Sequence, residues 1–73
     1  MAGIKFEIQE NLGVISESAN GWTKELNLVS WNDRPAKFDI RDWDENHQKM
    51  GKGLTLSIDE LRELKKVLNE MNL

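Results

Sequence analysis

The stretch Trp22–Trp43, WTKELNLVSWNDRPAKFDIRDW, decides the fold. Alternating apolar residues on both sides of Asn32–Pro35 predict two β-strands joined by a turn, since Asn, Asp and Pro are typical turn residues. Side chains alternate between the two faces of a strand, so each predicted strand has one apolar face to bury. The residues expected on that buried face are Leu26, Leu28, Phe38 and Ile40.

The opposite face of these strands has an unusual composition. Its members are Asn27, Val29, Trp31, Lys37, Asp39, Arg41 and Trp43. We expect this face to be presented to solvent, where aromatic rings interleaved with cations hold single-stranded nucleic acid by stacking on bases and contacting phosphates. The alternative is that the tryptophans belong to the core or to a dimer interface and that the charges form a solvated surface.

Trp22 and Lys24 have the same strand parity as Leu26, on the apolar side. A bulge near Lys24 or Glu25 would move both residues to the presented face. The sequence alone leaves both placements open.

The remaining elements follow from local patterns. Ile4, Phe6 and Ile8 alternate with polar residues and predict a strand, and Ser57 with Glu60 forms a capping-box pattern before an amphipathic helix. We expect one α+β domain over residues 1–73, an antiparallel sheet of four to five strands followed by one C-terminal helix. The predicted strands cover about 4–9, 12–17, 22–31, 36–43 and 53–56, and the helix about 57–71.

Composition narrows the class of protein. The 73 residues include no cysteine and carry a net charge of −3, with six of the ten cations in the neutral middle of the chain. A core this small is thin, and without disulfides oligomerisation is the means of stabilisation that remains. With no visible signal peptide and no apolar run long enough to span a bilayer, we expect a cytoplasmic protein with no membrane partner.

The sequence matches the motifs for phosphate and metal binding only in part. Gly51–Gly53 lacks the phosphate-loop frame, and the calcium-loop pattern that starts at Asp42 has His47 where glycine is required. We expect His47 to be a solvated loop residue. We therefore expect no catalytic residue, metal, cofactor or small-molecule substrate.

The run from Lys24 to Leu64 resembles the single-stranded-DNA-binding domain of the positive cofactor four family of transcriptional coactivators, most closely its small bacterial YdbC-like members. The shared motifs are the apolar strand ending in Trp31, the F-D-I-R-x-W run of Phe38–Trp43, and G-K-G-L-T-L-S at Gly51–Ser57 before the helix. The resemblance implies a homodimer whose C-terminal helices pack together and sequence-tolerant binding of single strands.

Position by position, the resemblance implies that Trp31 and Trp43 stack on bases and that Lys24, Arg41 and Lys52 contact phosphates or bases. With the face pattern, the full set expected to bind nucleic acid is Trp22, Lys24, Asn27, Trp31, Lys37, Arg41, Trp43, Lys49 and Lys52. The expected dimer interface is Leu61, Leu64, Leu68 and Met71.

The predicted function is non-catalytic binding of single-stranded DNA in transcription regulation or DNA maintenance, near the nucleoid if the source is bacterial. One alternative is a dimeric protein-interaction adaptor that uses the same aromatic face. Another is binding of single-stranded RNA, because the 2′-hydroxyl does not prevent stacking.

Overall fold

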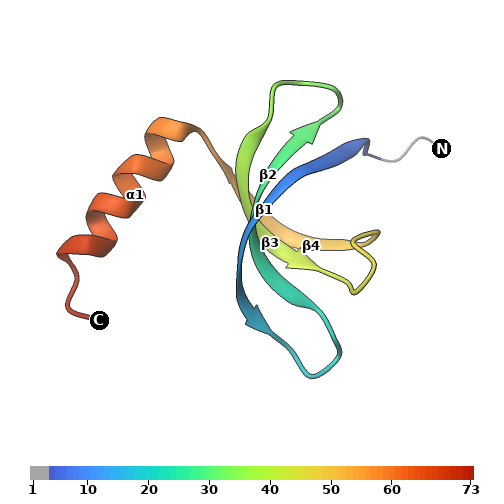
Figure 1. Cartoon of the computed structure of the whole chain (residues 1–73), viewed down its shortest axis with the longest axis horizontal. Coiled ribbons are helices and arrows are strands. Elements are labelled where there is room, and N and C mark those ends of the chain that lie inside the picture. The colour runs from blue at the N-terminus through green and yellow to red at the C-terminus, as the bar shows by residue number, and fades with distance from the viewer. Residues whose placement is uncertain (1–3) are drawn as a thin grey trace.

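The computed structural model describes residues 4–73; residues 1–3, which the predicted domain also covers, lie outside the described residues. Four antiparallel strands form one sheet in the order β1-β2-β3-β4, and one helix follows (Figure 1). The elements are β1 (Phe6–Glu17), β2 (Thr23–Trp31), β3 (Lys37–Trp43), β4 (Met50–Leu56) and α1 (Ile58–Glu70). The predicted α+β class is confirmed, with four strands.

The first strand differs from the prediction. Residues 4–9 and 12–17 were expected as two strands, but β1 is continuous, so the turn expected at Glu10–Asn11 is wrong. Its pairing with β2 shifts register between Ile8 and Glu10, between Asn11 and Gly13, and between Val14 and Ser16. Such bulges insert unpaired residues that bend a strand and increase its twist, so the polar residues interrupt the regularity of β1 without ending it.

The turns of the first two hairpins lie in the gaps, 18–21 and 32–35, that the predicted strands leave. Asn32 and Asp33 have φ values of 52° and 62°, and Gly21 has a φ of 88°. These left-handed conformations match the right-handed twist of the strands that flank a tight hairpin. Local turn chemistry therefore fixes both hairpins.

β2 and β3 pair without a register shift from Thr23–Trp43 to Val29–Lys37. Leu26 lies opposite Ile40 and Leu28 opposite Phe38, so the predicted common face of these four residues is confirmed. The irregularity near Lys24 lies in β1 instead of β2. Lys24 therefore stays on the side of Leu26.

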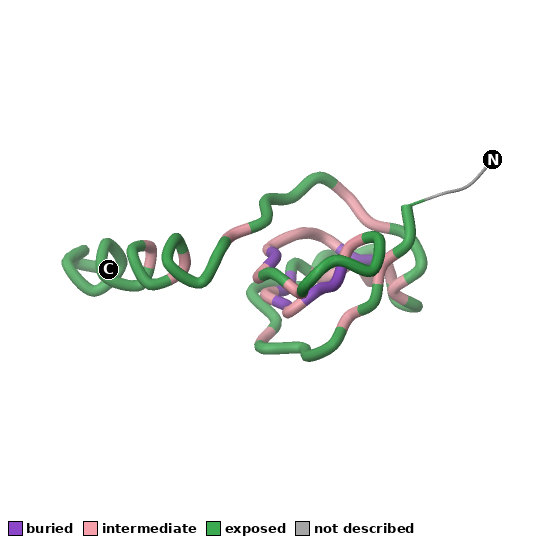
Figure 2. Tube along the Cα trace, turned by 90° about the horizontal axis from the view of Figure 1, so that it is seen from above, coloured by how far each residue is buried: buried purple, intermediate pink, exposed green. Residues whose placement is uncertain are grey.

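Helix α1 begins with the predicted capping box. The Glu60 backbone N–H donates to the Ser57 hydroxyl at 3.1 Å, and the Ser57 backbone N–H donates to the Glu60 carboxylate at 2.8 Å. These Ser57 bonds lower the pKa of Glu60, and the nearby charge of Lys37 lowers it further. The helix stands off from the sheet, and none of its residues is buried (Figures 1 and 2).

The structure reverses the expected burial of the two sheet faces. The fully buried side chains are Trp43, Val29, Asn27 and Asp39, which were predicted to face solvent. Leu26, Leu28, Phe38 and Ile40, predicted as the core, are only half-buried. The reason is curvature: the bulged strands bend so that the polar and aromatic face becomes concave and closes on itself, while the apolar face becomes convex and opens outward (Figures 1 and 2).

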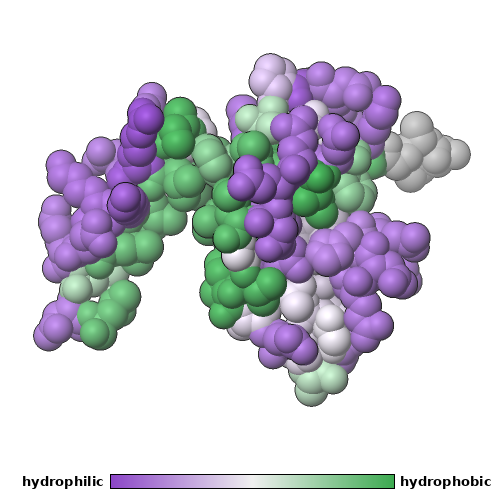
Figure 3. Space-filling model, viewed as in Figure 1, coloured by the Kyte–Doolittle hydropathy of each residue, from purple (hydrophilic) through white to green (hydrophobic). Residues whose placement is uncertain are grey.

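The convex face and the helix present apolar surface to each other (Figure 3). Between them lies a groove of about 560 Å³. Its apolar lining consists of Ile15, Leu26 and Ile40 from the sheet and Ile58, Leu61, Leu64 and Leu68 from α1. Ile58, Val67, Leu68 and Met71 remain between 45% and 55% exposed, so a single chain does not cover its own apolar stripe.

Gly53 marks a close approach of β3 and β4. A Cβ atom at this position would collide with Arg41 Cα and Cβ and with the Ile40 carbonyl oxygen. We expect Gly53→Ala to lower the free energy of unfolding by about 1–3 kcal/mol, the usual range for overpacking, in urea denaturation. Gly13→Ala is the matched control, because nothing lies within 4 Å of a Cβ at Gly13. Equal stability of both variants would contradict the crowding at Gly53.

Candidate nucleic-acid interface

Three aromatic rings from three strands meet on the concave face. The Phe6 ring centroid lies 5.2 Å from that of Trp43 and 6.1 Å from that of Trp31. Trp31 is half-buried, whereas Trp43 has no solvent exposure. In this conformation Trp31 can offer ring surface to a ligand, and Phe6 lies between it and the buried Trp43 as the ring that contacts both.

Both indole N–H groups of this cluster are buried and make no hydrogen bond within residues 4–73. A buried donor without an acceptor costs about 1–3 kcal/mol, so a hydrogen-bond acceptor close to either indole N–H would be favourable. The aromatic cluster therefore has polar groups to satisfy and is not a purely apolar core.

Arg41 covers Trp31 and is fixed by a buried carboxylate. Its guanidinium carbon lies 4.8 Å from the centroid of Trp31, and Nε and Nη2 donate to the two oxygens of Asp39 at 2.8 and 3.0 Å. Asp39 has no solvent exposure and also accepts from the Thr55 hydroxyl at 3.1 Å. The guanidinium therefore forms a rigid plane over the ring, with its charge largely offset by Asp39.

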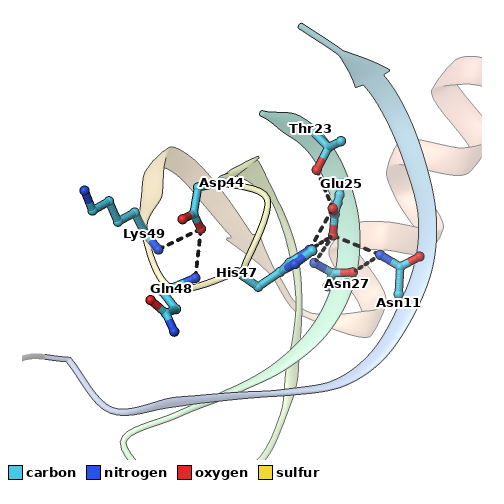
Figure 4. Close-up of polar contacts among 8 residues, drawn as sticks. All are labelled: Asn11, Thr23, Glu25, Asn27, Asp44, His47, Gln48 and Lys49. Carbon is cyan, nitrogen blue, oxygen red and sulfur yellow. Dashed lines mark hydrogen bonds and ion pairs between the residues drawn. The ribbon is translucent and has the colours of Figure 1, made fainter. Parts of the chain in front are cut away.

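A second buried carboxylate, Glu25, lies on the same face (Figure 4). It accepts hydrogen bonds from the Asn11 amide at 2.9 Å and the Asn27 amide at 3.1 Å, and also from the Thr23 hydroxyl. Burial raises the pKa of Glu25, but hydrogen bonds from Thr23, Asn27 and His47 and the charge of His47 outweigh burial, so its pKa is lowered. The ionised form is therefore favoured, and its contribution to stability is lost as pH falls through the lowered pKa.

His47 is not the solvated loop residue that the sequence suggests. Its Nε2 lies 2.9 and 3.0 Å from the two oxygens of Glu25, and its ring centroid lies 5.7 Å from that of Trp43. The correction arises from the fold, because the loop 44–49 bends back over the concave face and brings His47 to a residue 22 positions earlier.

The predicted binding residues do not all gather in one place. Asn27, Trp31, Arg41 and Trp43 lie together on the concave face. Lys24 forms a salt bridge with Asp42 at 3.2 Å on the apolar side, and Trp22 lies in the turn between β1 and β2. Lys37, Lys49 and Lys52 are exposed, the first near the start of α1 and the others in or beside the loop 44–49.

Sequence reasoning missed five side chains that shape the interface: Phe6, Asn11, Glu25, Asp39 and His47. The alternation placed Asp39 on the correct face but gave no sign of its pairing with Arg41. For Phe6 and Asn11 the missing information was the register of β1 against β2, which three shifts complicate. Among residues 4–73, no group of three or more His, Cys, Asp or Glu side chains could hold a metal ion.

The chain is similar in sequence to known proteins. The family model described as Transcriptional Coactivator p15 (PC4) matches residues 18–67. An uncharacterized protein of Treponema pallidum (strain Nichols) is 48% identical over 68 residues, which cover 93% of this chain and 80% of that protein. The family match includes β2, β3, β4 and most of α1, but not β1. Within residues 4–73, no helix is long and apolar enough to cross a membrane.

The pairing of Arg41 with Asp39 predicts a stability effect. Arg41→Ala leaves the buried Asp39 carboxylate without a cation, and we expect the free energy of unfolding in urea to fall by about 3–5 kcal/mol. Adding Asp39→Asn to this variant removes the stranded charge and should restore part of the loss. If Arg41→Ala costs less than about 1 kcal/mol, Arg41 does not neutralise Asp39 as described.

Proposed function

The chain belongs to the family of the transcriptional coactivator p15 (PC4), and on this premise we propose that it binds single-stranded DNA on its concave sheet face in a transcription-related role. This is the positive cofactor four family that the sequence motifs predict. The family is a nucleic-acid-binding, non-enzymatic one. The observation that carries the proposal for this chain is the half-buried Trp31 ring held under the guanidinium of Arg41.

Stacking is the main contact in this proposal. An unpaired base can reach the open part of the Trp31 ring or the plane of Arg41, whereas a base inside a duplex cannot. Phe6 and Arg41 fix the position of Trp31, which reduces the ordering cost of binding. Because every base has a stacking surface, such a site tolerates many sequences.

The proposed phosphate contacts are two exposed lysines, one in the loop 44–49 and one in β4. Lys49 and Lys52 are exposed, and neither forms a salt bridge in the part of the chain that the structure describes. Their number is small, and the whole chain has a net charge of −3. We therefore expect binding with a modest salt dependence, about −0.7 in logarithmic slope for each phosphate neutralised.

The test is a titration of intrinsic tryptophan fluorescence with oligo-dT, matched RNA and blunt duplex DNA. We expect oligo-dT to bind more tightly than duplex. Trp31→Ala should weaken binding by about 1–3 kcal/mol with little change in melting temperature or salt slope. Trp43→Ala is the comparison, and it should instead destabilise the fold by about 3–5 kcal/mol because Trp43 is fully buried.

Several outcomes would overturn this proposal. Equal or tighter binding to duplex DNA would remove stacking as its basis. Tighter binding to matched RNA would assign the face to RNA. Undiminished affinity of a well-folded Trp31→Ala variant would favour a protein-interaction adaptor over a nucleic-acid-binding module.

We also propose that two copies of the chain form a homodimer through α1 and the convex face. The support is the groove between them and the exposed apolar side chains on both of its walls. A contiguous apolar patch of this kind marks an interaction surface, and a two-fold dimer covers the same patch on both chains at once.

The dimer proposal predicts the effect of charge on the helix stripe. Leu68→Glu should dissociate or unfold the protein, because it places a charge in the apolar interface, whereas Lys66→Glu on the outer surface of the same helix should do neither. Light scattering at micromolar concentration, with circular dichroism as a check of folding, measures both. A folded wild-type monomer under these conditions would refute the dimer.

A further inference from the structure

The loop that joins β3 to β4, residues 44–49, is held together by hydrogen bonds between its own residues. The Asp44 carboxylate accepts from the backbone N–H groups of Gln48 and Lys49 at 2.8 and 2.9 Å, and the Asp44 N–H donates to the Lys49 carbonyl at 3.1 Å (Figure 4). These three bonds close the base of the loop. They do not by themselves fix where the loop lies relative to the sheet.

Within residues 4–73, His47 is the side chain of the loop 44–49 that hydrogen-bonds to the sheet. Its φ is 55°, a left-handed conformation that is uncommon outside glycine but that histidine adopts more readily than most residues. Its contacts are the two short distances to Glu25 in β2 (Figure 4) and the ring contact with Trp43 in β3.

The pair of Glu25 and His47 also affects the charge beneath the concave face. Glu25 and Asp39 are both buried there, and both would repel a polyanion. Arg41 offsets the charge of Asp39. For Glu25, the only salt-bridge partner within residues 4–73 is His47, which is a cation only when it is protonated.

We propose that Glu25 and His47 are positioning residues for nucleic-acid binding. The pair holds the loop 44–49, which carries the exposed Lys49, against the concave face. The inference rests on the proposed function. Neither residue has to touch the strand.

The test compares wild type, His47→Ala and His47→Gln by oligo-dT affinity and by amide hydrogen exchange of Gln48 and Lys49 without DNA. His47→Ala should bind about two- to tenfold more weakly, the cost of ordering long side chains anew, and should exchange faster. His47→Gln keeps a donor for Glu25. It should keep slow exchange and most of the affinity.

Asn46→Ala is the matched control, because Asn46 is an exposed neighbour of His47 in the same loop. It should behave as wild type in both measurements. Unchanged exchange and affinity in a folded His47→Ala variant would overturn the inference while leaving the proposed function intact. No binding of wild type to oligo-dT would overturn the proposed function and the role of the pair in binding, and the exchange data would still decide whether His47 positions the loop.

Discussion

Two buried carboxylates, Glu25 and Asp39, lie on one face of a four-stranded sheet. A buried charge is tolerated only where it is paired and hydrogen-bonded, so the rest of this face is arranged around these two groups. Asp39 fixes Arg41, and Arg41 in turn lies over Trp31. Glu25 accepts hydrogen bonds from the side-chain amide of Asn11 in β1 and from the Thr23 hydroxyl in β2. It also pairs with the imidazole of His47 in the loop 44–49.

Curvature makes this polar face the interior of the single chain. Three register shifts in β1, and another between β3 and β4, allow the sheet to bend until Phe6 meets Trp43. Bending in this direction spreads the opposite face, where Leu26 and Ile40 lie beneath a helix that does not close on them. An apolar surface of this size is costly in water, which is the physical argument for a second copy.

The arrangement separates the two tasks that the proposed function requires. The convex face and α1 supply apolar area for association, whereas the concave face supplies rings, a planar cation and flanking lysines for a single strand. The net charge of −3 does not argue against binding of a single strand on the concave face. The acidic excess lies toward the two ends of the chain, and the buried carboxylates are partnered, so the local field at the concave rim differs from the overall sum.

The sequence by itself determined what depends on neighbouring residues. The capping box at Ser57, the two hairpin turns, the α+β class and the sharing of faces among Leu26, Leu28, Phe38 and Ile40 all follow from short-range spacing. The family followed from the order of such local motifs, because none of them is specific alone. Of the expected binding residues, Asn27, Trp31, Arg41 and Trp43 were placed correctly together, since strand parity is a local property.

Only the tertiary structure decided which face closes on itself. Alternation assigns residues to two faces, but curvature comes from bulges, and bulges depend on pairing between strands distant in sequence. For the same reason Lys24 lies apart from the tryptophans, Trp43 is buried instead of presented, and His47 meets Glu25. The contact between His47 and Glu25 spans 22 positions and exists because a loop crosses the end of a bent sheet, a relation that no local pattern in the chain encodes.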